Sequence, residues 1–178
     1  GSVMPPPISE PLVELAQRDG FPYPVPPGMR LQTLYQDAQV KPLGWLSLVE
    51  WPQTQLDGTT VLTYRTVCRP PAVVLMPTNS KGEVMLVTTT QPGAGTYEGF
   101  VAGDTEPGDP SIFYRAVKEL GEETGYIADE YHLVYFHQFA ASIQWFAYTI
   151  IATNCHKIGE PIADIGERSR PYFVSVDV

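Results

Sequence analysis

Three glutamates in the segment 109–125 carry the clearest signal for chemistry in this 178-residue chain. Glu119, Glu122 and Glu123 are three and four residues apart, so a helix would make their side chains surface neighbours. Like charges at this spacing destabilise an isolated helix by about 0.2–0.5 kcal/mol per pair. Their carboxylate oxygens are the hard ligands that Mg²⁺ and Mn²⁺ prefer. The pattern predicts a divalent metal site, and the alternative interpretation is a solvated acidic face.

The same segment carries the signals that begin and end a helix. Asp109 is a good N-cap, and Pro110 follows at the first helical position, where a missing N–H costs nothing. Gly125 can take the left-handed conformation that ends a helix. Apolar residues recur three and four apart between these caps, which predicts one buried stripe. The stripe consists of Phe113, Ala116, Val117 and Leu120.

This segment, with the loop before it, resembles the Nudix box of the Nudix hydrolases. Gly103 matches the leading glycine of that box, and the run from Glu119 to Gly125 matches its Glu-aliphatic-x-Glu-Glu-x-Gly core. Asp109 stands where the box has its first glutamate, and the gap to the basic residue is eight residues rather than seven. That basic residue is Lys118 instead of arginine, and the two are not equivalent in a bidentate pair. Asp109 therefore has two interpretations: a helix cap, or a shortened substitute for the box glutamate.

The resemblance implies an α+β fold, an α/β/α Nudix sandwich with a mixed sheet between helices. It also implies a Mg²⁺- or Mn²⁺-dependent pyrophosphohydrolase that cleaves a nucleoside diphosphate linked to another moiety, of the ADP-ribose or nucleotide-sugar type. The alternative is a non-catalytic Nudix module that binds a nucleotide, RNA or a protein partner through a degenerate box.

The resemblance assigns roles to individual positions of this sequence. The implied catalytic residues are Glu122, Glu123 and Glu167, the last from a loop before the final strand. The implied metal ligands are the carbonyl of Ala102 and the carboxylates of Glu119, Glu122 and Glu123. Residues with an implied structural role in the box are Gly103, Asp109, Lys118 and Gly125, with Lys118 pairing a carboxylate to hold the loop on the helix.

The chain divides into a Pro-rich arm with a short helix (1–30), a β-hairpin region (31–69) and the main domain (70–178). The hairpin is predicted from strands at Trp45–Trp51 and Val61–Cys68 around the turn residues Asp57 and Gly58. It is similar to the N-terminal region of ADP-ribose pyrophosphatase-like Nudix enzymes, where these strands help to form a homodimer and part of the substrate pocket. A homodimer is therefore expected, and a plain edge hairpin is the alternative.

Alternating or fully apolar runs predict five strands in the main domain, with 143–152 at the centre of a sheet. These runs are Ala72–Met76, Val84–Val87, Leu133–Phe139, Ile143–Ala152 and Tyr172–Val176. Relatives usually continue into a C-terminal helix, so the domain is expected to be truncated at its C-terminus. The leading Gly1-Ser2 is typical of a tag remnant, so the native N-terminus is expected to be missing.

Composition limits the partners. The net charge of −9 and the sequence pI near 4.7 argue against a broad nucleic-acid or anionic-membrane surface. A capped or 5′-triphosphorylated RNA stays open as a substrate, although a small nucleotide fits the charge better. No apolar run approaches the roughly 20 residues of a membrane span. Cys68 and Cys155 are expected to be buried free thiols in an intracellular protein, and a removed organellar targeting peptide stays open.

Overall fold

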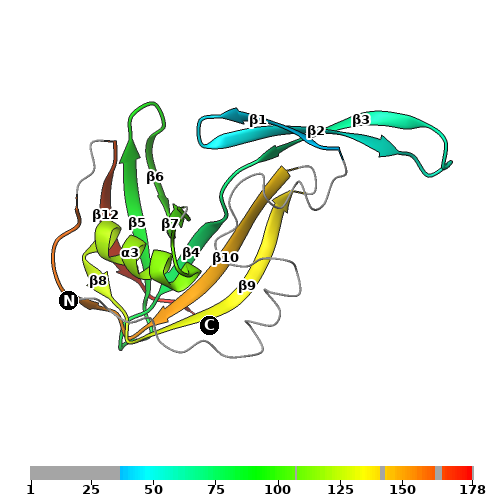
Figure 1. Cartoon of the computed structure of the whole chain (residues 1–178). Helices are drawn as coiled ribbons and strands as arrows, with labels where there is room; N and C mark the ends of the chain where they lie inside the picture. The colour runs from blue at the N-terminus through cyan, green and yellow to red at the C-terminus, as the bar shows by residue number, and fades with distance from the viewer. Residues whose placement is uncertain (1–36, 107, 141–142, 163–165, 178) are drawn as a thin grey trace.

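The computed structural model describes residues 37–106, 108–140, 143–162 and 166–177, so the predicted Pro-rich arm and its helix lie outside the described residues. The described chain forms two main β-sheets, a small two-stranded pair and the helix α3 (Figure 1). The first seven strands are β1 (Gln39–Leu43), β2 (Leu46–Thr54), β3 (Val61–Cys68), β4 (Ala72–Pro77), β5 (Val84–Gln91), β6 (Gly95–Gly99) and β7 (Val101–Asp104). They are followed by α3 (Ile112–Thr124), β8 (Tyr126–Ile127), β9 (Glu130–Ala140), β10 (Ile143–Thr153), β11 (His156–Lys157) and β12 (Arg168–Val174).

Strand β10 is the centre of the large sheet, as its aromatic and β-branched sequence predicts. It pairs antiparallel with β9 on one side and parallel with β3 and then β4 on the other. The sheet continues from β4 to β7 and from β3 through β2 to β1. Tyr148 and Ile150 of β10 are almost fully buried, so this strand supplies the middle of the main core.

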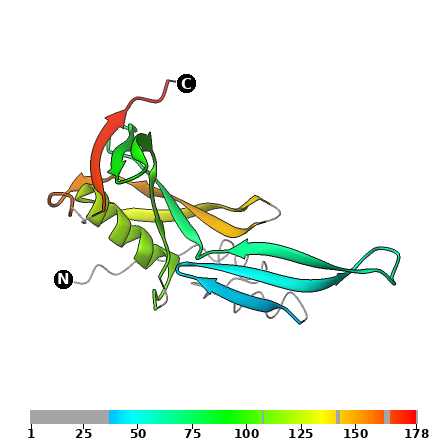
Figure 2. The same ribbon diagram turned by 90° about the horizontal axis from the view of Figure 1, so that it is seen from above.

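The predicted hairpin is confirmed, because β2 and β3 pair antiparallel from Ser47 opposite Cys68 to Thr54 opposite Val61. Asp57 closes its loop by accepting hydrogen bonds from the backbone N–H groups of Thr59 and Thr60. A third strand, β1, adds to the outer edge of β2, and its short sequence, interrupted by Pro42, gave no signal for it. The three strands project away from the rest of the molecule as an arm (Figure 2).

The small sheet has the order β12-β5-β6. The predicted strands Ala72–Met76 and Val84–Val87 are joined by a short turn, which would allow β5 to pair with β4. That pairing is limited to one bridge between Thr78 and Val84, and β5 instead pairs with β6 and β12. After the turn at Asn79–Gly82 the chain enters the second sheet. The physical reason is burial of Met85 and Val87, which close the core from the side opposite the large sheet.

Helix α3 lies between the two sheets, in contact with β4 and β7 of the large sheet and β12 of the small one. Its predicted stripe is confirmed: Phe113, Ala116 and Leu120 are at most 1% exposed, and Val117 packs partly buried against them. Gly125 ends the helix at φ 77°, with its N–H donating to the carbonyl of Gly121, as predicted.

The predicted N-cap is wrong. Ser111, not Asp109, caps α3, because its hydroxyl accepts the hydrogen bond from the N–H of Tyr114. Pro110 therefore lies before the cap, and the helix begins at Ile112. The physical reason is competition for the carboxylate: both oxygens of Asp109 are engaged by Arg115, and one also accepts from the N–H of Glu106.

Candidate active site

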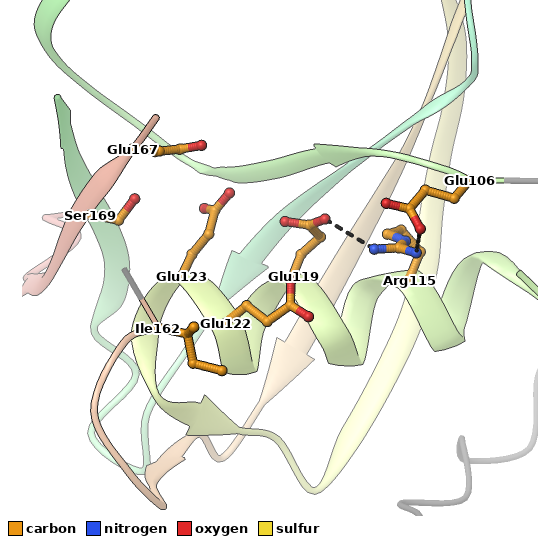
Figure 3. Close-up of a pocket in the computed structure, with 8 residues that line it drawn as sticks. All are labelled: Glu106, Arg115, Glu119, Glu122, Glu123, Ile162, Glu167 and Ser169. Carbon is orange, nitrogen blue, oxygen red and sulfur yellow. Dashed lines mark hydrogen bonds and ion pairs between the residues drawn. The ribbon is translucent and has the colours of Figure 1, made fainter. Parts of the chain in front are cut away.

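A cavity of about 220 Å³ opens beside the C-terminal half of α3, and its lining is mostly carboxylate. It is lined by Glu106, Arg115, Glu119, Glu122, Glu123, Ile162, Glu167 and Ser169. Figure 3 shows Glu119 and Glu123 pointing in the same direction from the helix, toward the segment that carries Glu167. The structure thus brings the three box glutamates and the loop glutamate predicted from sequence to one place.

Glu119 lies against β7, where a glycine makes room for it. A Cβ atom added to Gly103 would stand 2.2 Å from Cδ of Glu119, so no other residue type fits without moving this carboxylate. Gly103 therefore permits close approach of the β7 backbone to Glu119. Ala102 precedes it on the same strand, and its carbonyl as a metal ligand stays a prediction.

Arg115 anchors the loop before the helix. Its side chain is 5% exposed, and its Nε and Nη2 atoms donate to the two oxygens of Asp109 at 2.8 and 2.7 Å. The same guanidinium lies 3.1 Å from a carboxylate oxygen of Glu106 and 3.4 Å from Oε1 of Glu119. Burial alone would raise the pKa of Asp109, but the hydrogen bonds from Arg115 and from the N–H of Glu106 outweigh it, so that pKa is lowered.

The predicted role of Lys118 is wrong in part. Lys118 does face a carboxylate, but it is the half-exposed Glu122, one turn further along, at 3.8 Å. It does not hold the loop on the helix, because Arg115 already occupies both oxygens of Asp109. A helix turns by about 100° per residue, so a three-residue shift returns a side chain to nearly the same face. Arg115 thus reaches the loop from a position that the box alignment does not indicate.

The carboxylates of Glu119 and Glu123 are held close together in a partly buried setting. Loss of solvent, followed by the negative charges of Glu119 and Glu167, raises the pKa of Glu123. Loss of solvent also raises the pKa of Glu119, although the Arg115 guanidinium opposes that change. Raised pKa values at two neighbouring carboxyl groups indicate negative charge that the protein does not itself neutralise.

The segment 156–162 lies along the C-terminal end of α3. Gly125 approaches it so closely that an added Cβ would meet the carbonyl oxygen of Gly159 at 2.2 Å. Ile158 and Gly159 donate to the carbonyl of Gly125, and Ile162 donates to the carbonyl of Glu122. Beyond this segment, Glu167 and Ser169 line the cavity opposite Glu123, with Ser169 held by the pairing of β12 with β5.

The donor set fits a divalent cation in its chemistry. Five carboxylates line the cavity with one guanidinium, and the hard oxygen atoms of Glu119 and Glu123 share a partly buried site that is short of positive charge. Among the described residues, no three acidic, histidine or cysteine side chains already converge on one ion-binding point. The carboxylate side chains would therefore have to rotate toward one another to coordinate an ion.

Two residues of the site gave no usable sequence signal. Arg115 lies on the side of the helix away from the apolar stripe, and only its spacings of six residues from Asp109 and four from Glu119 could have indicated its role. Ser169 lies in strand β12, which begins at Arg168 rather than at the predicted Tyr172. Glu106 adds a third carboxylate to the Arg115 network from the loop.

The chain belongs to the NUDIX domain family, whose model matches residues 69–177, more than half of the sequence. This finding confirms the resemblance on which the fold and the box residues were predicted. Among the described residues there is no helix long and apolar enough to cross a membrane.

Comparison with solved structures agrees with the family. A structure described as an ADP compounds hydrolase superposes with a TM-score of 0.63 at 17% identity, over 78% of this chain and 75% of that chain. At this identity the likeness shows the fold, which is the α+β Nudix sandwich. A structure of MutT, described with proteins from Aliivibrio salmonicida and Vibrio cholerae, gives a TM-score of 0.43 at 24% identity over 58% of this chain and 77% of that chain. No curated protein matches the sequence significantly.

Proposed function

We propose that this protein is a divalent-metal-dependent pyrophosphohydrolase that cleaves a nucleoside diphosphate linked to a further moiety, of the ADP-ribose or nucleotide-sugar type. The observation that carries the proposal is the cavity in which Glu119, Glu122, Glu123 and Glu167 meet beside the NUDIX-family helix. Four carboxylates gathered at a cost in stability are expected where a cation and a polyanionic substrate bind.

Glu119 and Glu123 would hold Mg²⁺ or Mn²⁺, with Glu122 beside them and the carbonyl of Ala102 approaching from β7. When bound, the cation supplies positive charge that offsets the repulsion between the carboxylates and the diphosphate. Glu167 stands across the cavity from Glu123 and would accept the proton of the water that attacks phosphorus. Glu122 is half-exposed and could take part in the same proton transfer.

The Arg115–Asp109 pair supports catalysis over the degenerate-module alternative. The departures from the box at Asp109 and Lys118 would favour a decayed site if the loop were left unanchored. Arg115 instead forms a buried bidentate pair with Asp109 and also contacts Glu119. A planar guanidinium keeps this geometry better than a lysine would, so the loop and the first carboxylate are positioned by a different residue.

The test is product release from a panel of ADP-ribose, sugar nucleotides, NADH, diadenosine polyphosphates and a 5′-triphosphorylated RNA, with and without Mg²⁺ or Mn²⁺. We expect metal-dependent turnover of an ADP-ribose or nucleotide-sugar compound. Replacing Glu123 or Glu167 by glutamine should lower kcat by about 100-fold or more, the range for groups that act on the reacting atoms. Glu160→Gln is the matched control, because Glu160 is an exposed glutamate that pairs with Lys157 outside the cavity.

Unchanged turnover in Glu123→Gln would show that the site is assigned wrongly. Nucleotide binding without turnover of any compound would favour the non-catalytic module. Turnover of the RNA alone would keep the chemistry and change the substrate class.

We also propose that the protein forms a homodimer through the arm of β1, β2 and β3. The proposal rests on apolar side chains that the arm leaves exposed, since such patches mark contact surfaces. They are Leu43, Trp45, Leu56, Val61, Leu62, Tyr64 and Val67. Sedimentation at micromolar concentration should give the mass of a dimer, and Leu62→Glu should give the monomer. A wild-type monomer at that concentration would overturn the proposal.

A further inference from the structure

The inner face of the small sheet changes from apolar to hydroxyl-bearing at the end next to the carboxylate cavity. Met85 and Val87 of β5 face inward and are buried in the core, and Thr89 continues the same face at 3% exposed. Thr89 is directly opposite Ser169 on β12 and directly opposite Tyr97 on β6. Residues directly opposite each other across a sheet share a face, so Tyr97, Thr89 and Ser169 form one row.

The neighbouring row lies on the other face of this sheet. Thr90 and Thr96 are opposite each other and their hydroxyls are 2.9 Å apart in an exposed hydrogen bond. Arg168 and Arg170 flank Ser169 and are exposed, because side chains alternate along a strand. The cations of β12 therefore point away from the cavity, and the hydroxyl row is on the cavity side of the sheet.

Two observations connect this row with the four carboxylates. Ser169 lines the cavity itself, and its hydroxyl lies 3.5 Å from that of the buried Thr89. Tyr97 stands two strands away from Ser169, about 10 Å between backbones. The pKa of its phenol is raised by burial and then by the charges of Glu167 and Glu123. The ring is 48% exposed and so remains accessible to a ligand.

The charge balance limits what can bind beside the row. Of the described residues that line the cavity, Arg115 is the one cation, and Asp109, Glu106 and Glu119 already surround it. A third phosphate or a carboxylate on the ligand would therefore meet hydroxyls and further glutamates. A neutral group with several hydroxyls would instead find donors and acceptors in Ser169 and Tyr97, and an aromatic face for its C–H groups.

We infer that Tyr97 and Ser169 form a subsite for a neutral, hydroxyl-bearing sugar carried on the distal phosphate of the substrate. The inference rests on the proposed function, since the carboxylate cavity has to hold the diphosphate. Thr89 is too buried to touch a ligand, and it positions the Ser169 hydroxyl. The subsite selects a nucleotide sugar over a nucleoside triphosphate, because it presents hydroxyl groups and an aromatic face, and no cation, to the group beyond the diphosphate.

The experiment compares two ligands of equal diphosphate charge, ADP-ribose and the β-methyl ester of ADP. Binding to the full chain is measured by calorimetry in Ca²⁺, and turnover in Mg²⁺, for Tyr97→Ala, Tyr97→Phe and Ser169→Ala. Tyr97→Ala should weaken ADP-ribose binding about tenfold, the loss of one contact of ordinary strength, and methyl ester binding less than about twofold. Thr96→Ala, the next residue on the opposite face, is the control and should change neither.

Tyr97→Phe separates the two contacts that the tyrosine can make. Retained ADP-ribose affinity would assign stacking by the ring, and a loss equal to that of alanine would assign the hydroxyl. Equal losses for both ligands, or no loss for ADP-ribose, would overturn the subsite. Calorimetry decides this without turnover, so an inactive wild type that still prefers ADP-ribose would overturn the proposed hydrolysis and keep the subsite.

Discussion

Two arginines hold two junctions of this molecule, and they do so by different physics. Arg115 anchors the loop before α3, is 5% exposed, and is surrounded by the carboxylates of Asp109, Glu106 and Glu119. Arg69 lies where the arm joins the main domain, with its guanidinium 4.5 Å from the ring of Trp45 and 3.8 Å from that of Trp145.

Arg69 also donates to both oxygens of Asp104, but through one nitrogen at 3.1 Å, and the carboxylate is 40% exposed. At this junction the guanidinium of Arg69 therefore contacts two aromatic faces, in addition to the strand pairing between β3 and β10. The loop at the active site is held by a buried ion pair, which requires one geometry. Removal of one partner costs much stability, because the other charge is left buried and unpaired. The difference fits their tasks, because a catalytic loop must be placed more accurately than a projecting arm.

The largest expected effect comes from Arg115→Ala. It leaves the carboxylate of Asp109 buried without its partner, which should lower the free energy of unfolding by about 3–5 kcal/mol in urea titrations. Combining Arg115→Met with Asp109→Asn should cost less than the sum of the single changes, since neither charge of this pair is left buried without its partner. A loss below about 1 kcal/mol in Arg115→Ala would contradict the assignment of this pair as the anchor.

Arg69→Ala is expected to cost less, about 2 kcal/mol, because it removes two aromatic contacts and a partly solvated ion pair. Arg69→Lys keeps the charge and should recover less than half of the loss, since an ammonium cannot stack between two rings. High salt should change the effect of Arg69→Ala little. A loss that vanishes in 1 M salt would mean that the Asp104 ion pair, not stacking, holds the arm.

The pH dependence of stability tests the negative charge of Glu123, which Arg115 does not neutralise. Its pKa is raised in the fold above the usual 4.5, so the folded state holds a proton that the unfolded state has released. Stability from this group is complete below 4.5 and is lost as the pH rises toward the raised pKa. The metal-free protein should thus melt at a lower temperature at about pH 8 than at about pH 5.5, and Glu123→Gln should flatten that slope. An equal slope in both proteins, measured with a chelator present, would sink this account.

The smallest expected effect is that of Lys118→Ala. Its contact with Glu122 is long and half-exposed, so the free energy of unfolding should change by less than about 0.5 kcal/mol. Set beside Arg115→Ala, this variant shows which basic residue holds the loop. A loss as large as that of Arg115→Ala would restore Lys118 to the role predicted from the box.

Local signals along the chain determined a good part of this protein. The stripe of α3, its end at Gly125, the arm hairpin and the central place of β10 follow from periodicity and turn chemistry, which depend on neighbours in sequence. The family and three of the cavity's glutamates were also readable, because the box is a continuous segment. Glu167 was indicated only by its place before the last strand, and the structure puts it in the cavity.

Only the tertiary structure decided the rest, because it depends on which groups meet across the fold. By its residue type Asp109 could cap a helix or pair with an arginine. It pairs with Arg115, because the fold buries both side chains together. Strand β5 could pair with β4 or join the second sheet. It joins the second sheet, where its apolar face closes the core on the side opposite the large sheet. The row of Tyr97, Thr89 and Ser169 joins three strands separated by up to 80 residues, and only the register of the sheet aligns their side chains.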